Sequence, residues 1–246
     1  MGKHEHIHVS LVSYLNSYPF HYGLLNSDIE AIANPEIVPP AKCAENFKTG
    51  KSNIALVPVG ALPELKSYRI IEPFCIAASG IVKSVFLQSH SPLQKIQKIA
   101  LDPDSRSSNL LTKILCEHSW QISPEFTHIE NEADARVIIG DRALQSSENY
   151  PYRFDLAEEW TIKFGLPFVF AVWITAENID NEAISEFNKA LEFGISNIEK
   201  AVDKFGTANI SREDAIDYLN DNIVFRMDSD AKEAMNLFLR LAKITG

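Results

Sequence analysis

The segment Ser105-Arg106-Ser107-Ser108 brings three hydroxyl groups and a guanidinium group together within four consecutive residues. It follows Asp102-Pro103-Asp104 and precedes apolar residues that are spaced as on one face of a helix. The first backbone N–H groups of a helix have no intrahelical acceptor, and the positive end of the helix favours an anion. The segment therefore predicts a carboxylate-binding site. The alternative is an ordinary helix cap in which the serines and Arg106 face solvent.

Asn16 stands in a second polar turn, Ser13-Tyr14-Leu15-Asn16-Ser17, which follows an apolar run and precedes Pro19. Its uncharged amide can donate to a ligand hydroxyl or carboxylate and accept from another group. The same side chain could instead only cap the helix that is predicted after the turn. Asn16 and Ser13 are therefore candidates for ligand binding.

Three further candidates lie next to predicted strands. Ser84 follows a glycine-containing connection and could reach a cleft between two halves of the protein. Lys83 precedes it and is either an anion partner or a solvated side chain. Asp141 follows the strand predicted over residues 137–139, where it could cap a helix or hydrogen-bond a ligand hydroxyl.

The sequence offers little for a metal or a coenzyme. His4, His6 and His8 alternate and would share one face of a strand, but spacing near the start of the chain does not by itself make a metal site. The sequence contains no glycine-rich phosphate loop, nucleophile elbow or zinc motif. We therefore expect no metal and no cofactor.

The composition restricts the class of protein. With 246 residues, of which 46% are hydrophobic and 23% charged, the chain can bury one core or two small ones. A formal net charge of -10 disfavours general binding to nucleic acid or anionic lipid, but not to a small anion that responds to local charges. The sequence shows no signal-peptide pattern and no membrane span, and its three widely spaced cysteines fit a reducing compartment. We therefore expect a cytoplasmic protein.

Apolar periodicity predicts strands alternating with helices over the first two thirds of the chain. The predicted strands cover residues 7–12, 36–38, 54–59, 69–77, 84–88, 98–101, 126–129, 137–139 and 166–174. The predicted helices in this part cover residues 19–25, 41–49 and 107–117. The last third predicts one continuous helix over residues 184–202, a helix that begins at Ser211 with a capping pattern, and a helix over residues 231–241.

Strands that alternate with helices favour parallel sheets with right-handed crossovers. The order of elements indicates either two lobes between which the chain crosses twice, or one continuous doubly wound sheet. In the first case the crossovers are residues 79–83 and 165–167, since each contains a glycine that tolerates a change of backbone direction.

Seven segments resemble, in their order and spacing, the chorismate dehydratases of the futalosine-type menaquinone pathway. The resemblance covers roughly residues 7–175, and the C-terminal helices carry no matching motif. The segments are Ser13–Pro19 (SYLNSYP), Ile54–Val59 (IALVPV), Gly80–Val85 (GIVKSV), Leu101-Asp102 with Ser105–Leu111 (SRSSNLL), Ile138–Leu144 (IIGDRAL), Asp155–Trp160 (DLAEEW) and Gly165–Trp173 (GLPFVFAVW).

This resemblance implies an α/β fold of the two-lobed type 2 periplasmic-binding-protein-like class. Each lobe would be a mostly parallel sheet flanked by helices, with the ligand cleft between the lobes. Lobe I would be discontinuous, with residues 1–82 and 167–246, and would include the C-terminal helices. Lobe II would contain residues 83–166.

The resemblance also implies a hydro-lyase that converts chorismate to 3-[(1-carboxyvinyl)oxy]benzoate and water, without metal or cofactor. Asn16 and Ser84 would be catalytic and would orient the departing hydroxyl or the enolpyruvyl arm. The residues that bind the substrate would be Ser13, Lys83, Ser105, Arg106, Ser107, Ser108 and Asp141. The base stays open between Asp141, the one acid considered in these motifs, and a carboxylate of chorismate itself.

Two other functions are weighed against this one. The first is a cytoplasmic, non-enzymatic protein of the same fold that binds a small anion. The second is the related enzyme 1,4-dihydroxy-6-naphthoate synthase, although the Ser-Tyr-Leu-Asn and Gly-Asp-Arg segments match the dehydratases better. Neither nucleic acid nor a membrane is an expected partner, and the sequence does not predict the oligomeric state.

Overall fold

The computed structural model describes residues 7–27, 35–145 and 150–245, which form two lobes with one β-sheet each. The elements of lobe I are β1 (Val9–Val12), α1 (Tyr18–Leu25), β2 (Glu36–Val38), α2 (Pro40–Lys48), β3 (Ile54–Pro58), β4 (Tyr68–Ala78), β10 (Phe168–Ala176), α6 (Asn181–Ile195), α7 (Ile198–Phe205), α8 (Arg212–Asp217), β11 (Val224–Arg226) and α9 (Ser229–Thr245). The elements of lobe II are β5 (Val85–Ser89), β6 (Lys98–Ala100), α3 (Arg106–Leu115), β7 (Glu125–Thr127), β8 (Ala135–Ile139), α4 (Asp141–Gln145), β9 (Tyr152–Asp155) and α5 (Leu156–Phe164).

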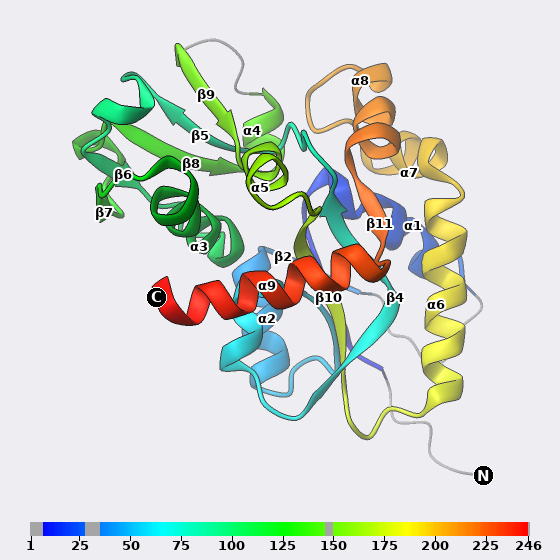
Figure 1. Cartoon of the computed structure of the whole chain (residues 1–246). Coiled ribbons are helices and arrows are strands. Elements are labelled where there is room, and N and C mark those ends of the chain that lie inside the picture. The colour runs from blue at the N-terminus through cyan, green and yellow to red at the C-terminus, as the bar shows by residue number, and fades with distance from the viewer. Residues whose placement is uncertain (1–6, 28–34, 146–149, 246) are drawn as a thin grey trace.

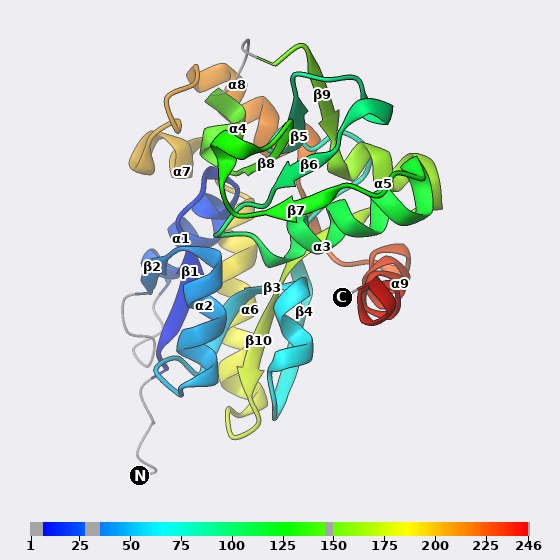
Figure 2. The ribbon, with the colours of Figure 1, turned by 90° about the vertical axis from the view of Figure 1, so that its left-hand side faces the viewer.

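The two sheets are separate, with helices packed against each (Figure 1). The six-stranded sheet of lobe I has the order β11-β4-β10-β3-β1-β2, and the five-stranded sheet of lobe II has the order β7-β6-β8-β5-β9. Figure 2 shows the sheet of lobe II above the sheet of lobe I, with α3 on the side that faces the sheet of lobe I. In this arrangement α3 of lobe II contacts α9, β10 and the short helix Val59–Glu64 of lobe I.

The sheets are mixed, which corrects the expectation of mostly parallel sheets. In lobe I, β1 is parallel to β2 and β3, but β10 is antiparallel to β3 and β4, and β11 is antiparallel to β4. In lobe II, β6 is parallel to β7 and β8, whereas β5 is antiparallel to β8 and β9. β5 and β10 each begin directly after a passage between the lobes, so no crossover helix returns the chain to the same edge of the sheet before them.

The two chain segments that connect the lobes are joined to neighbouring strands of lobe I, β4 and β10. β4 ends at Ala78 and β10 begins at Phe168, and these two residues are paired in the antiparallel ladder. The predicted crossovers over residues 79–83 and 165–167 lie at these passages, so the chain forms two lobes and not one continuous sheet.

The first passage is anchored to lobe II by Asp155. Its carboxylate accepts hydrogen bonds from the backbone N–H groups of Val82 and Lys83, at 3.0 and 2.7 Å. The other carboxylate oxygen caps α5 by accepting from the N–H groups of Ala157 and Glu158, at 3.1 and 3.2 Å. One side chain thus fixes both the start of a helix and the path of the crossover.

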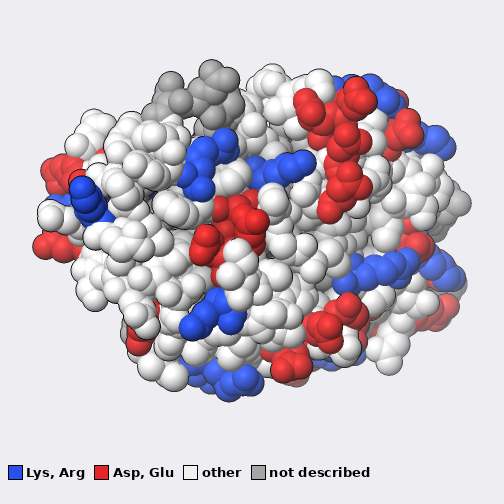
Figure 3. Space-filling view, turned by 45° about the horizontal axis from the view of Figure 1, so that its top comes forward, with Lys and Arg blue, Asp and Glu red and all other residues white. Residues whose placement is uncertain are grey.

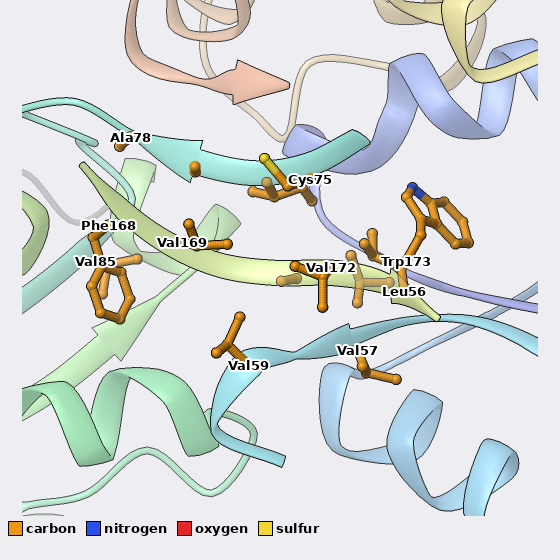
Figure 4. Close-up of a cluster of buried hydrophobic side chains, with 14 of the residues drawn as sticks. Leu56, Val57, Val59, Cys75, Ala78, Val85, Phe168, Val169, Val172 and Trp173 are labelled. Carbon is orange, nitrogen blue, oxygen red and sulfur yellow. The ribbon is translucent and has the colours of Figure 1, made fainter. Parts of the chain in front are cut away.

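The core of lobe I lies on both faces of its sheet (Figure 4). Trp173 of β10 contacts Phe20 of α1 and Phe187 of α6 edge to face, with ring centroids 5.7 and 4.9 Å apart. On the opposite face α2 packs against β1 and β3. All five residues of β3 are buried, as is typical of a continuous apolar run that is covered on both faces of a sheet.

The single helix predicted over residues 184–202 is wrong, because α6 ends at Ile195 and α7 begins at Ile198. Asn197 separates them with φ -132° and ψ 41°, outside the helical region. Residues of the apolar series on both sides of the break, such as Leu191 and Val202, are buried. Periodicity therefore continues across the break and does not reveal it.

Four short elements were not predicted: α4, β9, α5 and β11. Each has at most nine residues, and β11 has only three. The two helices are shorter than the window of roughly 11–18 residues in which apolar periodicity indicates a helix, and the two strands are short edge strands of their sheets.

Two observations concern the surface. Acidic and basic side chains form several small clusters on the face shown in Figure 3. Within the described ranges, no helix has both the length and the apolar character that crossing a bilayer would require.

The crossing of α1 and α6 depends on two glycines in backbone contact. A Cβ atom on Gly194 would lie 1.9 Å from the carbonyl oxygen of Pro19, and one on Gly23 would lie 1.9 Å from that of Ala190. Both oxygens belong to helix backbone and cannot move without moving the helix. The contact is important for the site because α1 continues directly from the turn that contains Asn16.

We therefore expect Gly194→Ala to lower the free energy of unfolding by about 1–3 kcal/mol or more, since overpacking forces the two helices apart. The exposed neighbour Ser196 provides the control, and Ser196→Ala should change stability by less than about 0.5 kcal/mol. Urea denaturation followed by circular dichroism measures both values. Equal stability of the two variants would contradict the backbone contact.

Candidate functional site

A pocket lies between the lobes. Its polar lining comes from both lobes and consists of Tyr14, Asn16, Ser84, Ser105, Ser107 and Ser108. The rest of the wall is formed by valine, isoleucine, proline, phenylalanine, alanine and glycine residues. The pocket therefore offers an apolar surface for a ring and hydroxyl and amide groups for polar substituents.

The start of α3 forms one side of the pocket. Ser105 is the N-cap, and its Oγ accepts a hydrogen bond from the N–H of Ser108 at 3.2 Å. The N–H of Asn109 bonds to the carbonyl of Ser105, also at 3.2 Å. The N–H groups of Arg106 and Ser107 belong to the first turn, where no intrahelical acceptor exists. This geometry is suited to a carboxylate at the helix start.

The role of Ser107 differs from that of Ser105, because the Ser107 hydroxyl forms hydrogen bonds that join the two lobes. Its Oγ accepts from the N–H of Gly60 at 3.0 Å and donates to the carbonyl of Phe170 at 3.0 Å. Gly60 lies in the short helix Val59–Glu64, which follows β3. A Cβ atom on Gly60 would lie 3.0 Å from the backbone nitrogen of Ser107. The start of α3 is thus held directly against the backbone of lobe I.

Asn16 lies in the turn after β1, within the short helix Leu15–Ser17. The Ser17 hydroxyl donates to the carbonyls of Val12 and Tyr14, at 2.6 and 2.8 Å, and so fixes the turn from inside. The side-chain oxygen of Asn16 is buried, and it has no hydrogen-bond partner among the described residues. A buried acceptor without a partner is costly unless a ligand or a water molecule satisfies it.

Ser84 lies at the end of the first passage and is 1% exposed. Its hydroxyl accepts a hydrogen bond from the hydroxyl of Tyr218, which belongs to lobe I, at 2.8 Å. Its backbone carbonyl accepts from the N–H of Gly140 at 2.8 Å. Ser84 and Asn16, which the sequence placed 68 positions apart, line the same pocket.

Tyr14 closes the pocket over Gly140. Gly140 has φ +64°, and a Cβ atom on it would lie 2.7 Å from the Tyr14 ring, so both backbone conformation and space require glycine. Burial, with the nearby carboxylates of Asp104 and Asp102, raises the pKa of Tyr14 to about 12. The Tyr14 hydroxyl therefore stays protonated near neutral pH.

Four of the predicted site residues lie outside the pocket lining. Ser13 and Lys83 are exposed, and Arg106 is exposed and ion-paired with Glu64 at 2.5 Å. Asp141 accepts a hydrogen bond from the N–H of Leu15 at 3.0 Å, and burial raises its pKa. The Asp141 contact holds the turn of Asn16 against lobe II, so this carboxylate supports the pocket from behind.

Asp102, next to the start of α3, carries a buried carboxylate. It accepts hydrogen bonds from Arg142 Nη2 at 2.8 Å and from the N–H of Asp104 at 2.9 Å. Burial raises its pKa, and Arg142 acts in the opposite direction. The backbone N–H of Asp102 donates to Asn109 Oδ1 at 3.0 Å, and the side-chain amide of Asn109 donates to the carbonyl of Asp102 at 2.7 Å. These two hydrogen bonds fix the loop before α3.

Sequence reasoning missed Tyr14, Gly60, Gly140 and Tyr218 as parts of the site. Tyr14 and Gly140 stand inside segments that carried the family resemblance, so the signal was present but was not used. Gly60 and Tyr218 contact residues 47 and 134 positions away, and no local pattern reports such pairs. Of the three alternating histidines, His4 and His6 lie outside the described residues.

Removing the Ser107 hydroxyl should loosen the contact between the lobes. We expect Ser107→Ala to lower the free energy of unfolding by about 1–3 kcal/mol, because the buried N–H of Gly60 loses its acceptor. Ser123→Ala, at an exposed loop serine, should change it by less than about 0.5 kcal/mol. Thermal and urea unfolding of both variants provide the comparison, and an unchanged stability of Ser107→Ala would argue against a structural contact.

Comparison with known proteins gives two curated relatives named chorismate dehydratase. The one from Campylobacter jejuni is 27% identical over 158 residues, which are 61% of this chain and 61% of the relative. The one from Thermus thermophilus is 26% identical over 189 residues, which are 67% of this chain and 68% of the relative. The chain thus spans about three fifths of the first relative and two thirds of the second.

Solved structures show the same fold at low identity. Protein AF1704 from Archaeoglobus fulgidus superposes with a TM-score of 0.80 at 17% identity, covering 99% of this chain and 98% of that one. The periplasmic aliphatic sulphonate binding protein SsuA from Escherichia coli superposes with a TM-score of 0.61 at 13% identity, covering 97% and 90%. These likenesses confirm the two-lobed periplasmic-binding-protein-like fold.

A family model described as menaquinone biosynthesis matches residues 7–243, which is nearly the whole chain and includes every residue that lines the pocket. This protein therefore belongs to the menaquinone biosynthesis family.

Proposed function

We propose that this protein is a hydro-lyase that converts chorismate to 3-[(1-carboxyvinyl)oxy]benzoate and water. One observation supports the proposal above the others: in a chain of the menaquinone biosynthesis family, Asn16, Ser84 and the start of α3 line one pocket between two lobes. The two relatives named chorismate dehydratase agree with it. The proposal divides the chain into lobe I, residues 1–82 and 167–246, and lobe II, residues 83–166.

The walls of the pocket suit this substrate. Chorismate has a six-membered ring, which the apolar residues can cover, and carboxylates that the start of α3 can receive. Ser105 and Ser108, with the free N–H groups of the first turn, would hold one carboxylate. Ser13, Lys83, Arg106 and Asp141 would act around this pocket without forming its wall.

The reaction breaks a C–H bond and the C–O bond of the neighbouring hydroxyl. The base takes the proton from carbon, the C–H electron pair becomes a ring double bond, and the C–O electron pair leaves on the oxygen. The proton is passed to that oxygen, which departs as water, and the ring becomes aromatic. Because aromatisation makes the step favourable, the protein must mainly orient the ring and stabilise the leaving oxygen. Positioning of this kind can contribute roughly 7–11 kcal/mol.

Asn16 and Ser84 would orient the leaving hydroxyl. In the part of the chain that the structure describes, the pocket wall contains no aspartate, glutamate or histidine side chain. We therefore assign the role of base to a carboxylate of chorismate, and the role of Asp141 to holding the Asn16 turn.

The proposed location is the cytoplasm. Cys43, Cys75 and Cys116 are all free and buried, as expected for a protein of a reducing compartment.

We expect Asn16→Ala to fold and to lower kcat/KM for chorismate by about 10²-fold or more, since it removes a group that contacts the leaving oxygen. The exposed Asn220 provides a matched control, and Asn220→Ala should keep full activity. Loss of the ultraviolet absorbance of the chorismate diene measures turnover, and mass spectrometry identifies the product. Undiminished turnover by Asn16→Ala would remove Asn16 from the reaction.

The same assay separates the proposal from the other two functions. A non-enzymatic binder would show a raised melting temperature with chorismate and no product. The related synthase would leave chorismate intact and would consume cyclic dehypoxanthine futalosine. Absence of product with wild-type protein and chorismate would therefore overturn the proposed function.

A further inference from the structure

Tyr218 lies behind the pocket wall, next to Ser84. It is the first residue of the helical turn Tyr218–Asn222, which follows α8 in lobe I, and it is 2% exposed. Its hydroxyl lies 2.8 Å from the Ser84 hydroxyl, across the boundary between the lobes. Tyr218 does not itself line the pocket, whereas Ser84 does. Any effect of its hydroxyl on a bound molecule therefore passes through a neighbouring side chain.

The direction of this hydrogen bond follows from the chemistry of the two groups. Burial raises the pKa of the Tyr218 phenol, against a smaller lowering by Ser84, so the phenol keeps its proton near neutral pH. A phenol is the stronger acid and the better donor, and an aliphatic hydroxyl is the better acceptor. Tyr218 therefore donates to Ser84 Oγ, and the proton of Ser84 itself is left to point elsewhere.

With Tyr218 as its donor, the Ser84 hydroxyl is free to turn its own proton toward the pocket that Ser84 lines. A hydroxyl has one donor and two acceptor positions, and Tyr218 occupies one acceptor position. Since Ser84 is 1% exposed and lines the pocket, its O–H is available to a group bound there. The tyrosine thus converts a hydroxyl that could turn freely into a donor with a fixed direction.

Asn16 completes the arrangement with an acceptor. Its Oδ1 is buried without a partner among the described residues. The pocket therefore presents one donor, Ser84 O–H, beside one acceptor, Asn16 Oδ1. A ligand hydroxyl, which both accepts and donates, complements this pair.

We propose that Tyr218 is a positioning residue for the dehydration, which sets the hydrogen-bond direction of Ser84 so that Ser84 and Asn16 together bind the departing hydroxyl of the substrate. This assignment rests on the proposed function. The assignment goes beyond the proposed function because it gives a role to Tyr218, which lies in the C-terminal third of the chain, where no sequence motif indicated a site residue.

The test is the kinetics of Tyr218→Phe, which removes the hydroxyl and keeps the ring in its buried place. We expect kcat for chorismate to fall roughly 10²-fold while KM changes by less than about threefold, as for a misplaced catalytic group. Tyr68→Phe, at a half-buried tyrosine of β4 outside the pocket, should leave both constants unchanged. A merely structural Tyr218 would lower the melting temperature of Tyr218→Phe without lowering kcat.

A double-variant cycle shows whether the effect passes through Ser84. If it does, Tyr218→Phe should cause a much smaller loss of kcat in the Ser84→Ala background than in the wild type. If the two losses multiply, Tyr218 does not act through Ser84 and the assignment is overturned.

A further variant covers the case in which Tyr218→Phe does not fold. Incorporation of 3-fluorotyrosine at position 218 keeps the ring and the hydroxyl but makes the phenol a stronger donor. A change of kcat at unchanged melting temperature supports the assignment, and an unchanged kcat overturns it.

The outcomes separate this inference from the proposed function. A wild-type protein that forms no product from chorismate overturns the proposed function, and this assignment with it. An active wild type together with a fully active Tyr218→Phe overturns the assignment alone.

Discussion

The pocket depends on the contact between the start of α3 and the backbone that follows β3. One hydroxyl, that of Ser107, accepts from Gly60 and donates to Phe170, so both of its hydrogen-bonding functions are used to join the lobes. Ser105 and Ser108 belong to the same turn of helix, and their positions relative to lobe I are therefore fixed by their neighbour. The three serines therefore differ in role: Ser107 joins the lobes, whereas Ser105 and Ser108 remain available to a ligand.

The polar groups that line the pocket are uncharged. Its polar wall consists of serine hydroxyls, an asparagine amide and a tyrosine, and the charged side chains nearby are used to hold loops: Asp141 for the Asn16 turn, Asp102 for the loop before α3, and Asp155 for the first passage. Fixed dipoles can stabilise an anion or a leaving oxygen without titrating. Burial raises the pKa of all three carboxylates, but each accepts at least one backbone N–H, and this favours the ionised form.

The fold could be predicted from the sequence where local patterns determine structure. The strand at residues 36–38, the buried run of β3 and the serine cap of α3 followed from residue type and spacing. The break at Asn197 could not, because the apolar series continues through it. The antiparallel direction of β5 and β10 also could not, since it depends on where the chain passes between the lobes. At the site, Asn16 and Ser84 carried a family signal, whereas Gly60 and Tyr218 act through contacts with distant residues, which spacing does not encode.

The pairing of Ala78 with Phe168 has a mechanical consequence. Both links between the lobes begin at adjacent points, so they define one axis, and a rotation about an axis displaces nearby atoms least. Ser84 stands directly after the first link, which Asp155 ties to lobe II. If the lobes swing apart, the hydroxyl pair of Ser84 and Tyr218 would travel only a short way, whereas groups farther from the axis would separate widely. A molecule would then enter through the part of the pocket far from the axis, while the hydrogen bond between Tyr218 and Ser84 near the axis would keep its geometry.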